Sequence, residues 1–333
     1  MIKKFVCVFV AVLIAAALFG CSNNAKVLSD TPLASQESRM SDSAQVSDET
    51  MLSSYNDNYN FQTSSSTLSL PSSSQGNVSK APSSSKAAVS STAPRKEISV
   101  LIPPGFTVRK IAARMEAKGV CKAADFIKAV NTGDFSAYSV TNGIADPQKR
   151  CYRLEGYLYP DTYTFYENSA PEEVIKKILQ NTQKKLVGKY SRSDMTLDQI
   201  ITLASLIEKE GGGNNNESGK ISSVLHNRLK QGKALQLDAP VYYLENEMED
   251  ADTQKYKIWY NTYNYQNREV KYECPGLPAG AICSPSAASL KAATDPETTD
   301  YLFFGSDKNK NYFYAVTYDE FKEKGTELGV NIK

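Results

Sequence analysis

Histidine is nearly absent from this sequence, since its 333 residues include only one, His226. Zinc sites of the three-histidine, HExxH or Cys2His2 kind need at least two histidines, so the sequence excludes them. A Ser-His-Asp triad would have to be built on His226. We therefore expect carboxylates to carry any chemistry, and we expect neither a metal ion nor a cofactor.

An excess of either charge is also missing, because 38 Lys and Arg residues face 37 Asp and Glu residues and the net charge is +1. Proteins that bind nucleic acids usually carry a strong basic excess or a basic stripe, so this balance argues against that class. The length is sufficient for two domains, which commonly hold roughly 100–200 residues each.

The first 20 residues have the pattern of an export signal. Two lysines precede an uncharged apolar run from Phe5 to Phe19, which is shorter than the ~20 residues of a membrane-spanning helix. The run ends in Leu18-Phe19-Gly20-Cys21, which resembles the lipobox of bacterial lipoproteins. An uncleaved N-terminal anchor and a simple secretory signal are the alternatives. We predict a lipoprotein signal peptide at 1–20, lipidation of Cys21, and a place on the outer face of the cytoplasmic membrane.

Residues 21–94 are predicted to be a disordered tether. Serine accounts for 22 of residues 22–94, and the few apolar residues recur with no period. Such a segment cannot bury enough apolar surface to offset the entropy lost on ordering. We expect a flexible chain with an r.m.s. reach of roughly 45–50 Å between the lipid anchor and a folded part that begins near Arg95.

The folded part opens with a small β-α-α pattern over residues 95–150. A strand is predicted at Ile98–Ile102, followed by a Pro-Pro-Gly turn. Thr107 is the predicted N-cap of a helix that Gly119 ends, and a second helix is predicted at Ala123–Val130. A generic α+β fragment explains this pattern nearly as well as a functional unit does.

Four cysteines lie in the predicted folded part, namely Cys121, Cys151, Cys274 and Cys283. Four cysteines allow three pairings, of which we favour the local one, Cys121–Cys151 with Cys274–Cys283. The alternative is that they are free, buried thiols that pack as small apolar side chains. No CxxC spacing occurs among them, which argues against redox chemistry and against a zinc ribbon.

The most informative segment is a helix predicted between Thr196 and the glycine run that starts at Gly211. Thr196 and Gln199 form a capping-box pattern at its start, and the glycines end it. At 100° per residue, nearly all side chains are apolar apart from one narrow polar stripe, which comprises Asp198, Thr202, Ser205 and Lys209.

Glu208 and Glu210 border the apolar face of this helix in its last turn. Burial and the negative end of the helix dipole both push the pKa of a carboxyl group upward. A raised pKa suits a general acid, which must be protonated near neutral pH. The alternative is that both side chains are half-exposed and pair with Lys209 or with a distant arginine. Periodicity does not choose between the two glutamates.

Six short segments, followed by Pro285 and Ser289–Ala292, carry a resemblance to a known family. They are Leu154–Tyr163, Leu203–Glu210, Ser223–Leu229, Leu235–Asp238, Tyr260–Tyr263 and Gly276–Ile282. In their content and their order they resemble the endolytic murein transglycosylases, the YceG-like family. The resemblance covers roughly Glu97 to the C-terminus.

The resemblance implies an α+β fold, in which a small LysM-like β-α-α subdomain (95–150) precedes a mixed α/β catalytic domain (151–333). It implies that Glu208 is the single catalytic acid/base and that Glu210 orients it. Glu208 would protonate the glycosidic oxygen between N-acetylmuramic acid and N-acetylglucosamine, and then accept the proton of the attacking muramoyl 6-hydroxyl. A 1,6-anhydro end results without water, so one carboxylate suffices where ordinary glycosidases use two.

The implied substrate is the glycan strand of peptidoglycan during wall synthesis, with peptidoglycan synthases as candidate partners. Side chains of the motifs that suit a sugar cleft are Glu155, Asn227, Arg228, Gln236, Asp238, Tyr260 and Asn261. The alternative is that Asn227 and Arg228 tie helix ends together, that most tyrosines belong to the core or rim, and that Glu155 pins the loop of Tyr157. The resemblance assigns His226 a structural role.

Three features depart from the family pattern. A lipobox and tether replace its usual N-terminal transmembrane helix, the loop Gly211–Asn216 is unlike its polar stretch, and Tyr312-Phe313-Tyr314 replaces a histidine-containing HxF element. Two other functions stay open. One is a hydrolytic muramidase that uses a second carboxylate such as Glu155 or Glu217, and the other is a non-catalytic peptidoglycan-binding lipoprotein.

Overall fold

A computed structural model describes residues 95–211, 216–247, 253–263 and 276–332, all within the compact unit Ser69–Lys333. The predictions for the signal peptide, Cys21, the tether and Cys274 therefore lie outside the described residues. None of the helices in the described ranges is long and apolar enough to span a membrane.

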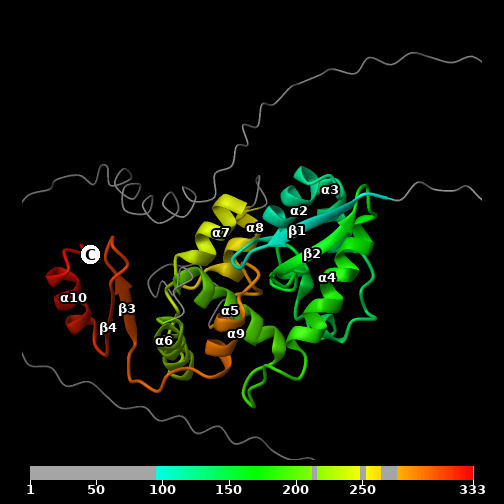
Figure 1. The fold of residues 1–333 in the computed structure, drawn as a ribbon. Helices are drawn as coiled ribbons and strands as arrows, with labels where there is room; N and C mark the ends of the chain where they lie inside the picture. The colour runs from blue at the N-terminus through cyan, green and yellow to red at the C-terminus, as the bar shows by residue number, and fades with distance from the viewer. Residues whose placement is uncertain (1–94, 212–215, 248–252, 264–275, 333) are drawn as a thin grey trace, which may run out of the picture. The chain divides into compact units, whose positions relative to one another are not determined.

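The described chain has a mixed fold of α-helices and two small antiparallel sheets, as predicted at the level of fold class (Figure 1). Two 3-10 turns, η1 (Ser139–Thr141) and η2 (Pro147–Lys149), interrupt the chain between the first helices and the second strand. The strands and helices, in chain order, are β1 (Glu97–Ile102), α2 (Val108–Ala117), α3 (Ala123–Thr132), β2 (Asp161–Tyr166), α4 (Pro171–Leu186), α5 (Leu197–Gly211), α6 (Ser218–Lys230), α7 (Ala239–Glu247), α8 (Thr253–Tyr260), α9 (Ala287–Thr294), β3 (Phe303–Ser306), β4 (Tyr312–Ala315) and α10 (Tyr318–Glu327).

The predicted β-α-α pattern is confirmed at the level of its elements. Thr107 caps α2 by accepting a hydrogen bond at Oγ1 from the Lys110 N–H at 3.2 Å. The partner of β1 was not predicted, however. β1 pairs with β2 in an antiparallel register from Glu97↔Tyr166 to Ile102↔Asp161, and α4 contacts α3. The sheet therefore crosses residue 150, where the sequence analysis divides the two parts.

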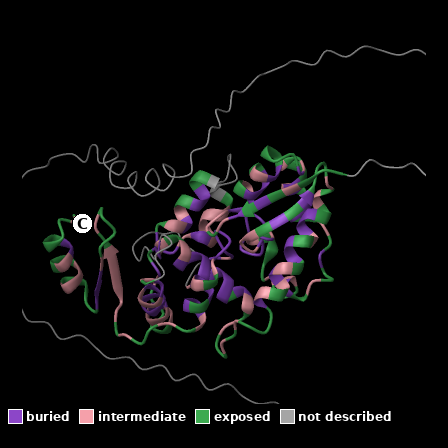
Figure 2. Ribbon diagram, viewed as in Figure 1, coloured by how far each residue is buried: buried purple, intermediate pink, exposed green. Residues whose placement is uncertain are grey.

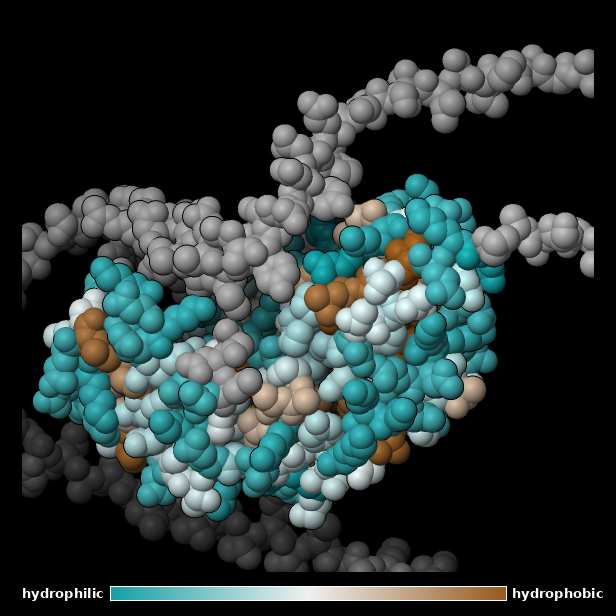
Figure 3. Space-filling view, in the orientation of Figure 1, coloured by the Kyte–Doolittle hydropathy of each residue, from teal (hydrophilic) through white to brown (hydrophobic). Residues whose placement is uncertain are grey.

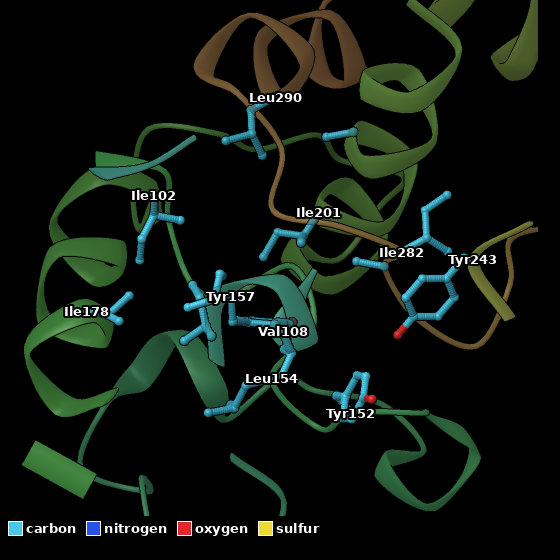
Figure 4. Close-up of a cluster of buried hydrophobic side chains, with 14 of the residues drawn as sticks. Ile102, Val108, Tyr152, Leu154, Tyr157, Ile178, Ile201, Tyr243, Ile282 and Leu290 are labelled. Carbon is cyan, nitrogen blue, oxygen red and sulfur yellow. The ribbon is translucent and has the colours of Figure 1, made fainter. Parts of the chain in front are cut away.

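One continuous core joins the two parts of the described chain. Figure 4 shows Ile102 of β1 and Ile178 of α4 in the same cluster as Ile201 of α5 and Leu290 of α9, and all four are at most 1% exposed. α5 contacts α6, α7 and α9, and most of its residues are buried (Figure 2). α5 is therefore the central helix of the described chain. The surface is different in character: the face drawn in Figure 3 is mainly hydrophilic, with apolar side chains in small separate patches.

The C-terminal hairpin has two different faces. Phe303 and Phe313 stack on Phe321 of α10, with ring centroids 5.7 and 5.2 Å from it. The other face carries Tyr314, which stacks on Phe304 with 6.4 Å between centroids. Because α10 covers only the first face, the tyrosines of β4 are left to contact the rest of the molecule.

The predicted disulfide between Cys121 and Cys151 is wrong, because both are free thiols. They lie in different surroundings, since Cys121 neighbours Asp125 and Glu116 while Cys151 neighbours Tyr243 and Tyr260. Burial raises the pKa of Cys121 to about 11 and that of Cys151 to about 12. Cys283 is also a free, buried thiol whose pKa burial raises. These three thiols stay protonated near neutral pH and pack as small apolar groups.

Gly156 brings the segment 154–163 against α5. Its φ is +84°, and a Cβ there would lie 2.5 Å from the Cβ of Ala281 and 2.8 Å from Cγ2 of Ile201. We expect Gly156→Ala to lower the free energy of unfolding by roughly 2–5 kcal/mol, combining left-handed strain with overpacking. Urea denaturation of the purified protein measures the loss.

Gly188→Ala is the matched control for this substitution. Gly188 has a φ of +75° but nothing within 4 Å of its would-be Cβ. It should lose only the strain component, about 1–2 kcal/mol. Equal losses in the two variants would show that the close approach at Gly156 does not matter.

Candidate active site

The capping box at the start of α5 is confirmed. The Gln199 N–H donates to Thr196 Oγ1 at 3.2 Å, and the Thr196 N–H donates to Gln199 Oε1 at 2.8 Å. The helix then runs to Gly211, the first glycine of the run that the sequence places at its end. The residues expected to carry the chemistry are therefore on the last turn of a well-defined helix.

Three residues of the polar stripe of α5, namely Asp198, Thr202 and Ser205, are buried, and two of them bond to segments outside the helix. Asp198 is 5% exposed and accepts from Arg150 Nη2 at 2.5 Å and from the Tyr157 hydroxyl at 2.6 Å. Ser205 Oγ accepts from the Ile282 N–H at 3.0 Å. Gly280 packs on the guanidinium, because a Cβ there would lie 2.9 Å from Arg150 Cζ. These contacts join α5 to segments on both sides of it in the sequence.

Glu208 projects from the last turn of α5 to the N-terminus of α9. Its Oε2 accepts from the Ser286 N–H at 3.0 Å and from the Ser289 hydroxyl at 2.7 Å. Ser286 is the N-cap of α9, and its side chain accepts from the Ser289 N–H. Oε1 accepts no hydrogen bond from the residues that the structure describes. Neither serine was predicted to contact Glu208, although Ser286-x-x-Ser289 is itself an N-cap pattern.

The turn after β1 lies beside the same segment. The Gly105 N–H donates to the Ser284 carbonyl and the Ser284 N–H donates to the Phe106 carbonyl, each at 2.8 Å. Arg114 of α2 lies over the Phe106 ring, 4.4 Å from its centroid. A single residue, Pro285, separates Ser284 from Ser286, the partner of Glu208, so the β-α-α unit forms one border of the site.

The side chain of Glu210, which also belongs to α5, lies at the N-terminus of α7, whereas that of Glu208 lies at the N-terminus of α9. Burial and then the Asp238 carboxylate raise its pKa to about 7, against a hydrogen bond from the Ala239 N–H that lowers it. The predicted upward shift is therefore confirmed for Glu210. The backbone carbonyl of Glu210 accepts from the Tyr312 hydroxyl at 2.6 Å, so β4 also contacts this turn.

Asn227, Arg228 and Gln236, predicted to bind sugar, form a structural network. Asn227 Nδ2 donates to the carbonyls of Thr299 and Tyr301 at 2.8 and 3.0 Å. Arg228 is 7% exposed and donates to two backbone carbonyls and to Gln236 Oε1. The structure thus favours the alternative in which Asn227 and Arg228 tie α6 to other segments, while Gln236 itself is exposed.

Glu155 and Tyr260 lie in the interior. Glu155 is 1% exposed, and its carboxylate accepts from the Val108 N–H at the start of α2 and from the Tyr243 hydroxyl, both at 3.0 Å. Tyr260 is 0% exposed and packs against Tyr243, with 5.7 Å between ring centroids. These positions favour the alternative roles, in which Glu155 fixes a loop and Tyr260 belongs to the core.

Asp238 and Asn261 each accept a hydrogen bond from Tyr263. The Tyr263 hydroxyl donates to Asp238 Oδ1, and its N–H donates to Asn261 Oδ1 at 2.9 Å. Asp238 is exposed and neighbours Glu210, whereas Asn261 is half-buried. Of the residues predicted to bind substrate, Asp238 and Gln236 are the most accessible.

Two other residues of the sequence analysis have defined contacts. Glu217 accepts from the Tyr314 hydroxyl at 2.6 Å. His226 Nε2 lies 3.0 Å from the Ala293 carbonyl, and burial lowers the pKa of the imidazole, so the ring is neutral near pH 7 and donates this bond. His226 therefore joins α6 to α9, in agreement with its structural interpretation. Within the described ranges, no cluster of three or more His, Cys, Asp or Glu side chains could hold a metal ion.

Comparison with known proteins places the chain in a family. Residues 76–327, more than half of the chain, match the YceG-like family. The chain belongs to the YceG-like family. Two similar proteins are named endolytic murein transglycosylase. The one from Streptococcus pneumoniae serotype 2 (strain D39) is 27% identical over 70% of this chain and 44% of its own length, and the one from Bacillus subtilis (strain 168) is 30% identical over 55% and 49%.

A solved structure agrees with this YceG-like assignment. The crystal structure of a yceG-like protein from Listeria monocytogenes is 29% identical, has a TM-score of 0.54, and covers 70% of this chain and 76% of that one. The chain spans about half the length of the curated relatives that it matches. The resemblance that the sequence motifs carry is confirmed at the level of the family.

The raised pKa of Glu210 predicts a pH-dependent stability. Between its ordinary value of 4.5 and its folded value of about 7, the folded protein holds a proton that the unfolded chain has released. Stability therefore falls as pH rises through this range, by up to roughly 3 kcal/mol at about 1.4 kcal/mol per pKa unit. Urea denaturation at pH 5 and pH 8 should show this slope in the wild type and its loss in Glu210→Gln.

Glu323→Gln serves as the control, because Glu323 is an exposed glutamate of α10. This variant should retain the wild-type dependence on pH. If Glu210→Gln keeps the same slope as the wild type, the Glu210 carboxyl does not hold the proton.

Proposed function

We propose that this YceG-like chain is an endolytic lytic transglycosylase of peptidoglycan, a lyase that leaves 1,6-anhydro-N-acetylmuramic acid ends. The observation that carries the proposal is the fixed carboxylate of Glu208. Family membership and the names of the two relatives support the substrate class. Glu210, half-buried beside Asp238, is proposed to orient the end of α5 on which Glu208 lies.

The hydrogen bonds of Glu208 support a single carboxylate that acts first as acid and then as base. Oε2 already accepts from the Ser286 N–H and the Ser289 hydroxyl, so the proton of the neutral acid belongs on Oε1. Oε1 would give this proton to the glycosidic oxygen as the bond from that oxygen to the anomeric carbon breaks. The muramoyl 6-hydroxyl would then bond to the same carbon and return its proton to Oε1.

The contacts of the other carboxylates weigh against a hydrolytic muramidase. Such an enzyme needs a second carboxyl group that faces the sugar, roughly 5–9.5 Å from the first. Glu155 is buried at the N-terminus of α2, and Glu217 is bonded to Tyr314. Neither is poised as a free partner of Glu208, which favours the reaction that needs only one carboxylate.

The remaining parts of the chain fit a wall enzyme held at a membrane. We propose that Cys21 is lipidated after removal of residues 1–20, and that residues 21–94 tether the enzyme to the outer face of the cytoplasmic membrane. The unit around β1, α2 and α3 is proposed to be a LysM-like element that holds glycan. Peptidoglycan synthases are the proposed protein partners, because nascent strands would be the substrate.

Glu208→Gln tests the proposal directly. The amide cannot donate and accept the proton in turn, so activity should fall by about 10²–10⁴-fold, the usual range for general acid–base catalysis. Purified sacculi are digested with wild-type and variant protein, and the new glycan ends are identified by mass spectrometry. The wild type should produce anhydromuramoyl ends, and the variant should not.

Glu217→Gln is the matched control, since it removes the rival carboxylate and should leave the anhydro products in place. Reducing ends from the wild type would instead identify a muramidase. A wild type that binds sacculi and releases nothing would identify a non-catalytic binding protein. Full activity in Glu208→Gln would refute the assignment of the site.

A further inference from the structure

A cavity of about 870 Å³ lies beside α5 and α6, and neither Glu208 nor Glu210 lines it. From α5 it takes Asp198, Gln199 and Thr202, and from α6 it takes Ser223, His226, Asn227 and Lys230. The rest of its lining comes from the segments around Asp146, Arg192 and Lys233, from Trp259, and from residues 276–279 and 296–299. Cavities of this size suit a ligand of several hundred daltons.

The floor of the cavity is held by hydrogen bonds. Ser223 Oγ lies 2.7 Å from Thr299 Oγ1, and Asn227 Nδ2 donates to the Thr299 carbonyl at 2.8 Å. His226 is bonded to the Ala293 carbonyl. Elsewhere in the lining, the Ala279 N–H donates to the Trp259 carbonyl at 2.9 Å. These contacts give the cavity a fixed shape before any ligand enters.

Charges remain at both ends of the cavity after its internal ion pairs are counted. Three acids of the wall already pair with cations, in the pairs Lys149–Asp146, Arg192–Asp194 and Arg150–Asp198. Lys230, Lys233 and Glu297 also line the cavity and form no ion pair with a described residue. The lysines lie at and just after the C-terminus of α6, and Glu297 lies against Gly219 at its N-terminus, 2.8 Å from that residue's would-be Cβ.

The separation of these charges defines the kind of ligand. Gly219 and Lys230 are eleven residues apart on α6, which is a rise of about 16 Å at 1.5 Å per residue. The cavity thus offers cations at one end and a carboxylate at the other, and its lining also includes an indole and apolar loop atoms. An elongated, zwitterionic peptide with carboxylates and one amino group complements this pattern, whereas a neutral sugar would leave both charged ends unused.

We propose that this cavity binds the stem peptide of peptidoglycan, an inference that rests on the proposed function and names a second recognition site for the same substrate. The carboxylates of the peptide face Lys230 and Lys233, and the amino group of its diamino acid faces Glu297.

The chain supplies its own reporter for this test, because Trp259 is its single tryptophan. Full-length Glu208→Gln protein is titrated with a synthetic stem tetrapeptide that carries free carboxylates and the amino group of its diamino acid. Saturable change in tryptophan fluorescence, with heat in isothermal titration calorimetry, is expected. Lys230→Ala/Lys233→Ala should weaken binding roughly three- to tenfold, as expected for two partly exposed ion pairs.

Lys184→Ala/Lys189→Ala is the matched control, since it removes two exposed lysines on and after α4 and should bind the peptide as the parent does. A second arm compares kcat/KM on peptide-bearing strands and on strands stripped by an amidase. With Glu208 intact, the Lys230/Lys233 double variant should lose activity on the first substrate only.

Absence of both fluorescence change and heat would overturn the proposal, as would equal loss on the two kinds of strand. A response to stripped strands but not to the tetrapeptide would overturn it too, by showing that the cavity binds sugar. None of these results affects the proposed function, which stands or falls on anhydromuramoyl ends from the wild-type protein.

Discussion

The C-terminus of α5 places two carboxylates where a helix is least able to stabilise them. The last turn of a helix carries a partial negative charge, so the dipole of α5 gives no stabilisation to the side chains of Glu208 and Glu210. Each is met by the N-terminus of another helix, Glu208 by α9 and Glu210 by α7. The two helix starts oppose the field of α5, and they fix the directions in which the carboxylates point. The proposed chemistry depends on these contacts between the C-terminus of α5 and the N-termini of α9 and α7.

The other end of α5 is secured by a buried ion pair. Asp198 and Arg150 are each at most 5% exposed, and loss of one partner alone would leave an uncompensated charge, at a cost of roughly 3–5 kcal/mol. Tyr157 satisfies the second oxygen of Asp198, and Gly280 allows the guanidinium to pack closely. The pair therefore fixes the position of α5 relative to segments that are far from it in the sequence, both before it and after it.

This arrangement explains why the family motifs are spread along the chain. Gly156 of one motif approaches Ile201, Ile282 of another donates to Ser205, and Asp238 of a third neighbours Glu210. The motifs are largely the surroundings of α5. Read singly, each looks like a weak signal, because its meaning lies in a contact with a helix elsewhere in the sequence.

Local features of the fold could be predicted from the sequence, and long-range ones could not. The caps at Thr107 and Thr196 follow from side chains within three residues of each other. The burial of Asp198, by contrast, depends on a partner 48 residues away, so periodicity placed it only on a polar stripe. The same limit explains the missed pairing of β1 with β2, the wrong disulfide between Cys121 and Cys151, and the interior positions of Glu155 and Tyr260.

The contacts of β4 near the C-terminus of α5 involve two of the features that depart from the family pattern. The Tyr312 hydroxyl binds the Glu210 carbonyl, and the Tyr314 hydroxyl binds Glu217, so one face of β4 contacts the chain on both sides of residues 212–215. These residues belong to the loop that is unlike the family's polar stretch, and the tyrosines stand where the family often has a histidine element. Because a hydroxyl donor stays uncharged across the neutral range, this bond to the end of α5 does not depend on the protonation of a histidine. The two departures therefore meet at one place in the fold, the turn that carries Glu208.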